Sequence, residues 1–173
     1  QEPRPLLRAG LYWPGAEVLS LTDLAPHWRV GAPVAGLVFY RALLQSGTLA
    51  PIDALIRALA ARGLNPLPIF VNSLKEAVAA DLIRTLYAEV APDITLNCTG
   101  FAISQPGAAA FATPFDGADH PVLQVVLSSE SEAQWQSSLR GLSLRVLAMQ
   151  VAPPEPDGRI LPRAISWKSA ARF

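Results

Sequence analysis

Four short apolar runs recur along the chain at intervals that suit crossover connections. They start at residues 34, 67, 94 and about 122, so they lie 33, 27 and 28 residues apart. Each interval has room for a strand, a helix and two loops, whereas a hairpin needs far fewer residues. The spacing therefore predicts parallel strands that are joined by right-handed crossovers.

The residues within and between these runs predict layers on both sides of the sheet. Residues 34–40 are apolar at every position but one glycine, which is typical of a strand covered on both faces. The next helix has one apolar face and is expected to end at Gly63. That face comprises Ile52, Leu55, Ile56 and Leu59. We expect an α/β fold, a doubly wound, mainly parallel sheet with helices on both faces, of the flavodoxin-like or Rossmann-like three-layer kind.

With 173 residues the chain is long enough for one domain and short for two. Residues 1–33 hold five prolines and predict an irregular segment with a possible edge strand near Leu11–Trp13. Residues 34–150 are the predicted α/β domain. Residues 151–173 are expected to form an extended segment at the edge of the sheet or a link to a next domain. Because the chain lacks an initial methionine, we also expect an excised piece of a longer polypeptide.

Composition argues against several classes of partner. The formal charge is zero and the basic residues are scattered, which disfavours nucleic acid. Hydrophobic residues make up 51% of the chain, yet no apolar stretch approaches the roughly 20 residues that span a bilayer. The first ten residues lack the pattern of a secretion signal, so we expect a cytoplasmic protein and no membrane contact.

Sequence motifs give no catalytic residue, metal site or cofactor within this chain. Neither GxGxxG nor GxxxxGK is present, which disfavours dinucleotide binding and a phosphate loop for ATP. Cys98 is the single cysteine and falls in an apolar run, where a buried, inert thiol is expected. His27 and His120 each lie beside a proline, and a structural or exposed role is expected for both rather than metal ligation.

Ligands of open parallel sheets bind beyond the carboxyl ends of the strands, where the strand order reverses. For the commonest order of four such strands, 2-1-3-4, that point lies between the first and the third. The candidate ligand-facing rim there is Tyr40, Arg41, Ser46, Ser73, Lys75, Thr99 and Phe101. A plainer interpretation stays open: Ser73 and Glu76 form a capping box for the next helix, while Arg41 and Lys75 are solvated. Residues 100–120 predict a long loop beside this rim.

Five strings, in one order and with similar spacing, resemble the family of CobN-type cobaltochelatase and H-type magnesium chelatase large subunits. The resemblance covers almost the whole chain and is closest to the N-terminal part of the cobalt branch. The strings are LYWPG (11–15), LVFYRALLQSGTLAPIDALIRALAARGLNPLPIFVNSLK (37–75), LNCTGFAIS (96–104), PVLQVVLSS (121–129) and RGLSLRVLAMQVAPPEPDGRILPRAISWK (140–168).

The resemblance implies a piece of the porphyrinoid-binding subunit of an ATP-dependent cobaltochelatase, a ligase that forms nitrogen–metal bonds. The whole enzyme would insert cobalt(II) into hydrogenobyrinic acid a,c-diamide in aerobic cobalamin biosynthesis. Its partners would be the remaining domains of the subunit, an AAA+ ATPase that holds the ATP, a second small subunit and the tetrapyrrole. This piece would be scaffold or cleft wall and inactive alone. The alternatives are a magnesium chelatase H-type fragment and a stand-alone flavodoxin-like ligand-binding module without catalysis.

Overall fold

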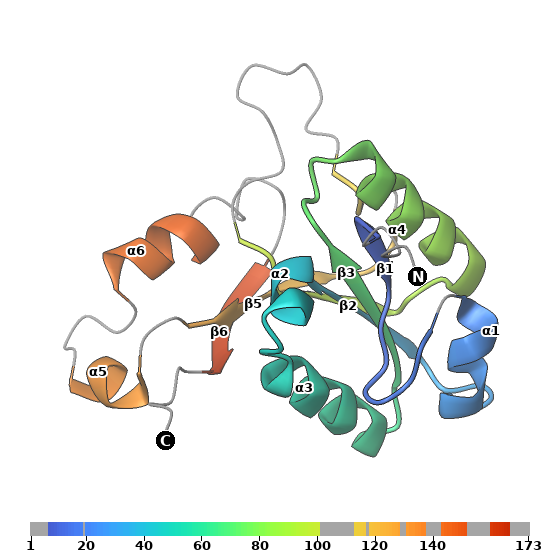
Figure 1. The fold of residues 1–173 in the computed structure, drawn as a ribbon, viewed down its shortest axis with the longest axis horizontal. Coiled ribbons are helices and arrows are strands. Elements are labelled where there is room, and N and C mark those ends of the chain that lie inside the picture. Colours follow the sequence, from blue (N-terminus) through green and yellow to red (C-terminus); the bar gives the residue numbers. More distant parts are fainter. Residues whose placement is uncertain are drawn as a thin grey trace, which may run out of the picture.

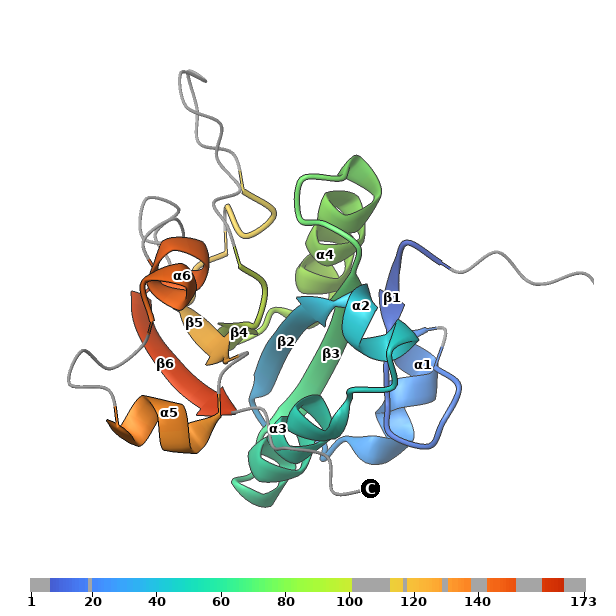
Figure 2. The same ribbon diagram turned by 60° about the vertical axis from the view of Figure 1, so that its left-hand side comes forward.

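The computed structural model describes residues 7–18, 20–100, 113–116, 118–128, 131–137, 143–151 and 160–166. Within them lies a six-stranded sheet of order β1-β3-β2-β4-β5-β6. All neighbouring strands are parallel except β1, which runs antiparallel to β3. β1 and β6 form the two edges of the sheet (Figure 2). The strands are β1 (Ala9–Leu11), β2 (Val34–Tyr40), β3 (Asn65–Val71), β4 (Ile94–Asn97), β5 (Val122–Leu127) and β6 (Ile160–Ser166).

The order of the four central strands confirms the topology expected from the sequence. In chain order, β3-β2-β4-β5 is the predicted 2-1-3-4, and the reversal lies between β2 and β4. The register pairs Tyr40 with Val71 and Val38 with Asn97. The carboxyl ends of β2, β3 and β4 therefore lie along one margin, as parallel pairing requires.

Helices cover both faces of the sheet, which confirms the doubly wound α/β class. On one face, α3 (Ala50–Ala61) packs with the odd-numbered residues of β2, and α2 (Arg41–Gln45) lies beside it (Figure 1). On the other, α4 (Ala77–Val90) and α1 (Leu21–Leu24) meet the even-numbered ones. Leu37, Phe39 and Val38 are all fully buried. Burial from both sides explains why β2 is an unbroken apolar run.

The predicted end of the first crossover helix agrees with the structure, but the predicted capping box before α4 is wrong. α3 has Pro51 in its first turn and is followed by Gly63 at φ +83°. α4 begins only at Ala77, with Glu76 as its N-cap residue. The Ser73 hydroxyl accepts from the Lys75 N–H at 3.2 Å and so closes a local turn. The Glu76 carboxylate accepts from the Asn72 amide instead of reaching back to Ser73.

The N-terminal part of the described chain is more ordered than the sequence suggested. Its edge strand is β1, and it also carries α1 and the short η1 (Ala25–His27). Leu11, Val18 and Leu24 are buried in the α4-side core. The remaining elements are α5 (Glu132–Ser137), α6 (Leu144–Val146) and the π-helical η2 (Leu147–Val151). The domain boundaries at residues 34 and 151 stay predictions.

Candidate functional site

Tyr40 joins the ends of β2 and β4 at the point where the strand order reverses. It is the last residue of β2, and its hydroxyl donates to the Gly100 carbonyl at 2.8 Å. The Gly100 N–H donates back to the same hydroxyl at 3.1 Å. Two hydrogen bonds therefore hold the chain just after β4 against the end of β2, where an open crevice was expected.

A buried polar network lies directly behind this junction. The Asn97 side-chain oxygen accepts from the Thr99 hydroxyl at 2.9 Å and from its N–H at 3.3 Å. The Asn97 amide donates to the Gln124 side-chain oxygen at 3.1 Å. The Gln124 amide donates to the Thr99 carbonyl at 2.7 Å. All three residues are buried, so the predicted rim residue Thr99 is committed to a structural network.

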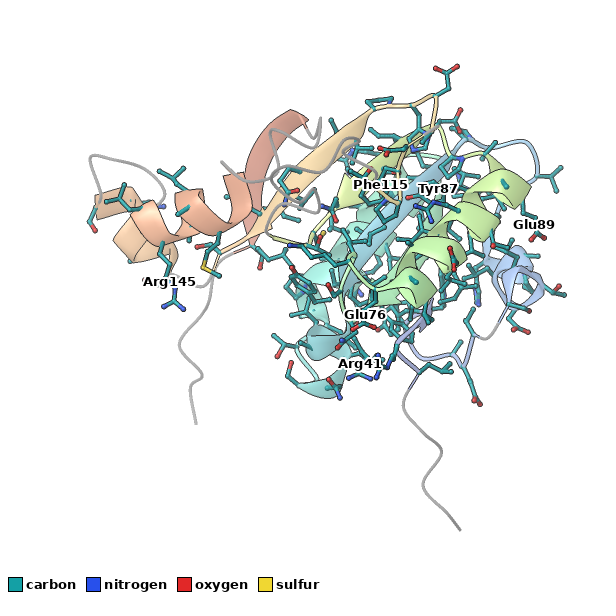
Figure 3. All side chains as sticks on the ribbon, turned by 90° about the horizontal axis from the view of Figure 1, so that it is seen from above. Arg41, Glu76, Tyr87, Glu89, Phe115 and Arg145 are labelled. Atoms are coloured by element: carbon teal, nitrogen blue, oxygen red, sulfur yellow. The ribbon has the colours of Figure 1, made fainter. Side chains whose placement is uncertain are left out.

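Arg41 belongs to a second cluster at the same margin, beyond β3. Because Tyr40 pairs with Val71, Arg41 follows β2 where Asn72 follows β3. Arg41 and Glu76 lie at this corner of the molecule (Figure 3). The Arg41 guanidinium donates to the Leu7 carbonyl at 3.4 Å, and the Arg8 guanidinium lies 3.6 Å from the Glu76 carboxylate. The cluster thus contains two arginines and one carboxylate.

The structure brings together only part of the predicted rim. Ser73 and the exposed Lys75 share the turn before α4, next to the Arg41 cluster. Ser46 lies at the far end of α2, where its hydroxyl is within hydrogen-bond distance of the Leu43 carbonyl, at 3.3 Å, and of the Thr48 hydroxyl, at 2.9 Å. Phe101 lies outside the described residues, as does most of the predicted loop from 100 to 120. The function assigned to this rim stays a prediction.

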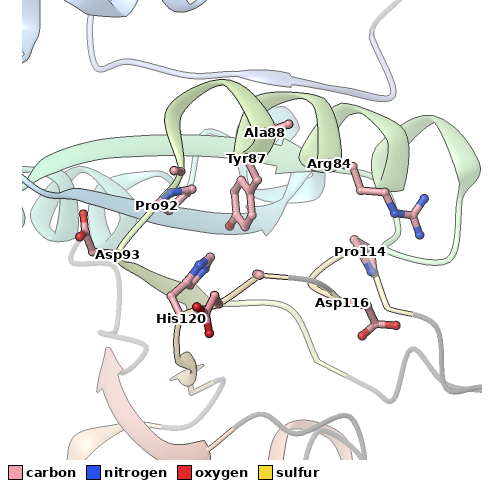
Figure 4. A pocket seen from close by; sticks show the side chains of 11 residues that line it. Arg84, Tyr87, Ala88, Pro92, Asp93, Pro114, Asp116 and His120 are labelled. Atoms are coloured by element: carbon pink, nitrogen blue, oxygen red, sulfur yellow. The ribbon is translucent and has the colours of Figure 1, made fainter.

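A cavity of about 600 Å³ opens at the opposite margin, near the amino ends of β4 and β5 (Figure 4). Its walls come from the second half of α4, the link to β4, and the residues just before β5. Its size is in the range of small-molecule pockets. The lining residues are Arg84, Tyr87, Ala88, Ala91, Pro92, Asp93, Pro114, Asp116, Ala118, Asp119 and His120.

His120 connects this cavity to the core. Its Nε2 lies 2.8 Å from the Thr95 hydroxyl, which lies 2.7 Å from the Tyr87 hydroxyl. Burial lowers the pKa of His120, although the nearby carboxylates of Asp93 and Asp119 act to raise it. Burial also raises the pKa of Tyr87, against the opposite effect of its hydrogen bond to Thr95. Both side chains are therefore neutral at pH 7.

Sequence reasoning missed most of these polar partners. Gln124 lies inside the apolar run PVLQVVL, and a buried polar residue within such a run is a signal that a partner is needed. The cavity gave no comparable signal, because Tyr87, Thr95 and His120 come from a helix, a strand and a loop. For His120, of which a structural or exposed role was expected, the structure shows a hydrogen bond with Thr95.

The chemistry available to the described residues is hydrogen bonding and charge, without an activated nucleophile. Burial raises the pKa of the Cys98 thiol to about 12, so it stays protonated at neutral pH. No group of three or more His, Cys, Asp or Glu residues suited to a metal ion occurs in the part of the chain that the structure describes. Among the described helices, none has the length and apolar character needed to span a bilayer.

Comparison with known proteins gives a consistent result. The family described as CobN/Magnesium Chelatase matches residues 1–172. The chain is 46% identical over its whole length to the aerobic cobaltochelatase subunit CobN of a Sinorhizobium species, and 40% identical over 99% of its length to that of Pseudomonas aeruginosa. It is 29% identical over 92% of its length to the H-type magnesium-chelatase subunit of Rhodobacter capsulatus, and spans 14% of that protein.

A solved structure has the same fold. The catalytic subunit of cobaltochelatase from Mycobacterium tuberculosis superimposes with a TM-score of 0.69 at 25% identity, over 91% of this chain and 13% of that one. The chain spans 14% of the length of each of the two CobN relatives. The family match over nearly every residue and the shared fold together establish that this chain belongs to the CobN/magnesium chelatase family.

Proposed function

We propose that this chain is a scaffold or cleft-wall region of the porphyrinoid-binding subunit of an ATP-dependent cobaltochelatase. The enzyme would insert cobalt(II), its metal substrate, into hydrogenobyrinic acid a,c-diamide in aerobic cobalamin biosynthesis. The observation that carries the proposal is the 46% identity to a CobN subunit over the whole chain. A magnesium chelatase role has weaker support, because identity to magnesium chelatase subunits is 29–30%.

The proposal assigns catalysis and ATP hydrolysis to other parts of the assembly. An AAA+ ATPase partner would hold the ATP, and a second small subunit would complete a cytoplasmic complex. The chain would contribute positioning, and alone it would be inactive. In support, the polar side chains at the carboxyl margin of the sheet are largely engaged with the protein itself.

If the region forms part of the cleft wall, the carboxyl margin near Arg41 is the surface that would face the substrate. Hydrogenobyrinic acid a,c-diamide retains carboxylate side chains, and a guanidinium suits carboxylates through paired N–H donors. Lys75 adds an exposed ammonium group on the adjacent turn. A cleft-wall role therefore predicts that Arg41 and Lys75 contribute to tetrapyrrole binding, whereas a scaffold role predicts that they do not.

The test uses the intact large subunit with its two partner subunits, the tetrapyrrole, cobalt(II) and ATP. Cobalt insertion, followed by the absorbance of the macrocycle, is expected for the reconstituted enzyme. Failure to insert cobalt, with insertion of magnesium into a porphyrin instead, would overturn the cobalt assignment.

Paired substitutions then separate wall from scaffold. Arg41→Gln with Lys75→Gln is expected to weaken tetrapyrrole binding by about tenfold if each charge contributes a partly screened contact of the usual size. The matched control is Arg57→Gln with Arg62→Gln, which removes two exposed charges from α3 and its C-cap, away from this margin. Equal tetrapyrrole affinity in both double variants would support the scaffold role and would contradict the cleft-wall role.

A further inference from the structure

A chain of hydrogen bonds leads from the core of the domain to the wall of the cavity. Tyr87 from α4 meets Thr95 from β4, and Thr95 meets His120 just before β5. Tyr87 and Thr95 are buried, while His120 is half-buried. Within the described residues, the side chains of Tyr87, Thr95 and His120 make these two hydrogen bonds, Tyr87 with Thr95 and Thr95 with His120.

The hydrogens of this trio can be matched in only one way when both hydroxyls are to be satisfied. Tyr87 donates to the Thr95 oxygen, and Thr95 donates to Nε2 of His120. Nε2 must then be an acceptor, so the imidazole is neutral and carries its proton on Nδ1. A phenol, a hydroxyl and an imidazole nitrogen thus form a directed chain.

Protonation of His120 breaks this match. Nε2 then carries a hydrogen and can only donate, so the Thr95 oxygen becomes its acceptor. The Tyr87 and Thr95 hydrogens then compete for the one contact between the two oxygens, and one of these hydrogens is left without an acceptor. An unsatisfied buried donor is unfavourable, so the folded arrangement resists the proton.

The charged groups around His120 oppose one another. Asp93, in the link from α4 to β4, and the neighbouring Asp119 favour the protonated ring. Arg84, from α4, lines the same cavity and carries the opposite charge to these carboxylates. The Asp116 carboxylate is occupied by the N–H and hydroxyl of Thr113, at 2.6 and 2.7 Å. The effect of burial on the pKa of His120 is larger than that of the two carboxylates, so the pKa is lowered. The hydrogen-bond pattern of the trio also favours the neutral ring.

Among the described residues, two ring contacts on Tyr87 attach the segment that precedes β5 to α4. Phe115 from this segment packs against the Tyr87 ring with centroids 6.3 Å apart, and the His120 ring lies 5.6 Å from it on centroids. The second of these contacts is that of the hydrogen-bonded His120. Loss of that contact leaves the Phe115 contact with Tyr87 in place.

We propose that Tyr87, Thr95 and His120 form a pH-sensitive latch that fastens the described residues before β5, 113–116 and 118–120, onto α4 and β4. The latch is closed while His120 is neutral. It opens when His120 takes a proton, and the cavity wall formed by the segment then loosens.

The first test is the protonation state of His120, read from its ring nitrogens by NMR with assigned side chains. The Nδ1–H neutral form is expected at pH 7.5, and the Nε2–H neutral form would overturn the proposal. The expected midpoint of its titration lies below the ordinary value of 6.5. Thr95→Val should raise the midpoint by about one unit, a tenfold change in proton affinity, because protonation then strands no further hydroxyl.

Thr95→Ser is the matched control, because it keeps the hydroxyl at the same place. Its midpoint is expected to stay near that of the unchanged chain. Equal midpoints for the Ser and Val variants would show that the hydroxyl does not govern the proton, and would overturn the latch.

The second test is hydrogen exchange of the backbone amides of Thr113, Phe115, Asp116 and Ala118 at pH 5 and 7.5, corrected for intrinsic rates. In the unchanged chain, the protection factors of these amides should fall by at least about threefold at the lower pH, provided that at least half of the His120 side chains are protonated there. His120→Gln is the control, since its amide oxygen can accept from Thr95 and it cannot be protonated in this range. It retains all three nearby carboxylates, so an equal loss of protection in both proteins would overturn the proposal.

Discussion

Gly36 in β2 lies directly against the Tyr87 hydroxyl, which leaves no space for a β-carbon. A Cβ built at Gly36 would clash with this oxygen and would lie 3.1 Å from the Thr95 hydroxyl. The glycine in the otherwise apolar run of β2 therefore makes room for the buried hydroxyl pair that leads to His120. The glycine in this central strand is thus linked, through the two hydroxyls, to His120, the one histidine among the described residues that line the cavity.

Gly36→Ala is expected to destabilise the domain by about 1–3 kcal/mol, because the methyl group forces Tyr87 away from Thr95. Urea unfolding followed by circular dichroism measures the change. Tyr87→Phe removes the clashing oxygen, so the two substitutions together should cost less than the sum of the single ones. Additive costs would show that Gly36 and Tyr87 do not constrain each other.

Tyr40→Phe tests the junction between the ends of β2 and β4. It removes the group that both donates to and accepts from Gly100 and leaves the ring in place. We expect a loss of about 1–2 kcal/mol in the free energy of unfolding, since two backbone groups lose a partner. Increased exchange of the Gly100 amide should accompany it. Unchanged protection at Gly100 would show that the hydroxyl does not hold this segment.

The architecture could be predicted because it depends on patterns within single segments. Residues 34–40 are apolar throughout since β2 is covered by α3 on one face and α4 on the other. The face of α3 appears at the spacing of a helix, with Ile52 and Ile56 fully or nearly buried. Such signals are local, and they were sufficient for the layers. The strand order was taken as the commonest one for sheets of this kind, and the structure agrees with it.

The site could be predicted only in part, because its contacts depend on register and on loops. Asn97 and Gln124 are neighbours through the pairing of β4 with β5, and the sequence does not state that register. The start of α4 was misplaced for a similar reason. Asn72 and Arg8 engage Glu76, and Arg8 comes from a distant segment. Long-range partners override the local capping pattern.

Tyr12 contributes stability that is lost at alkaline pH. Its hydroxyl donates to the Asp53 carboxylate at 2.7 Å, which joins the segment after β1 to the first turn of α3. Burial, then the hydrogen bond and the charge of Asp53, raise the pKa of Tyr12 from 10.0 to about 12. Above pH 10 the unfolded chain loses this proton first, so stability falls as pH rises toward 12.

Urea unfolding between pH 9 and 11 measures this slope. Tyr12→Phe should flatten the part of the slope that Tyr12 causes. Asp53→Asn keeps an acceptor but removes the charge, so a spectrophotometric titration should show Tyr12 ionising at lower pH than in the unchanged chain. An unchanged slope in Tyr12→Phe would assign the alkaline loss to other groups.

Cys98 is expected to resist thiol reagents for as long as the domain stays folded. It follows β4, is free and buried, and packs in the core on the α3 side. Burial raises its pKa from 9.0 to about 12, which lowers the thiolate fraction at neutral pH by roughly a thousandfold, and access is blocked as well. Reaction with an aromatic disulfide reagent should therefore be slow in buffer and should accelerate across the urea unfolding transition. Cys98→Ala provides the blank, because it removes the chain's single thiol. A fast reaction in buffer, at the rate seen in urea, would show that the carboxyl end of β4 opens without global unfolding, contrary to the buried network of Asn97 and Thr99 beside it.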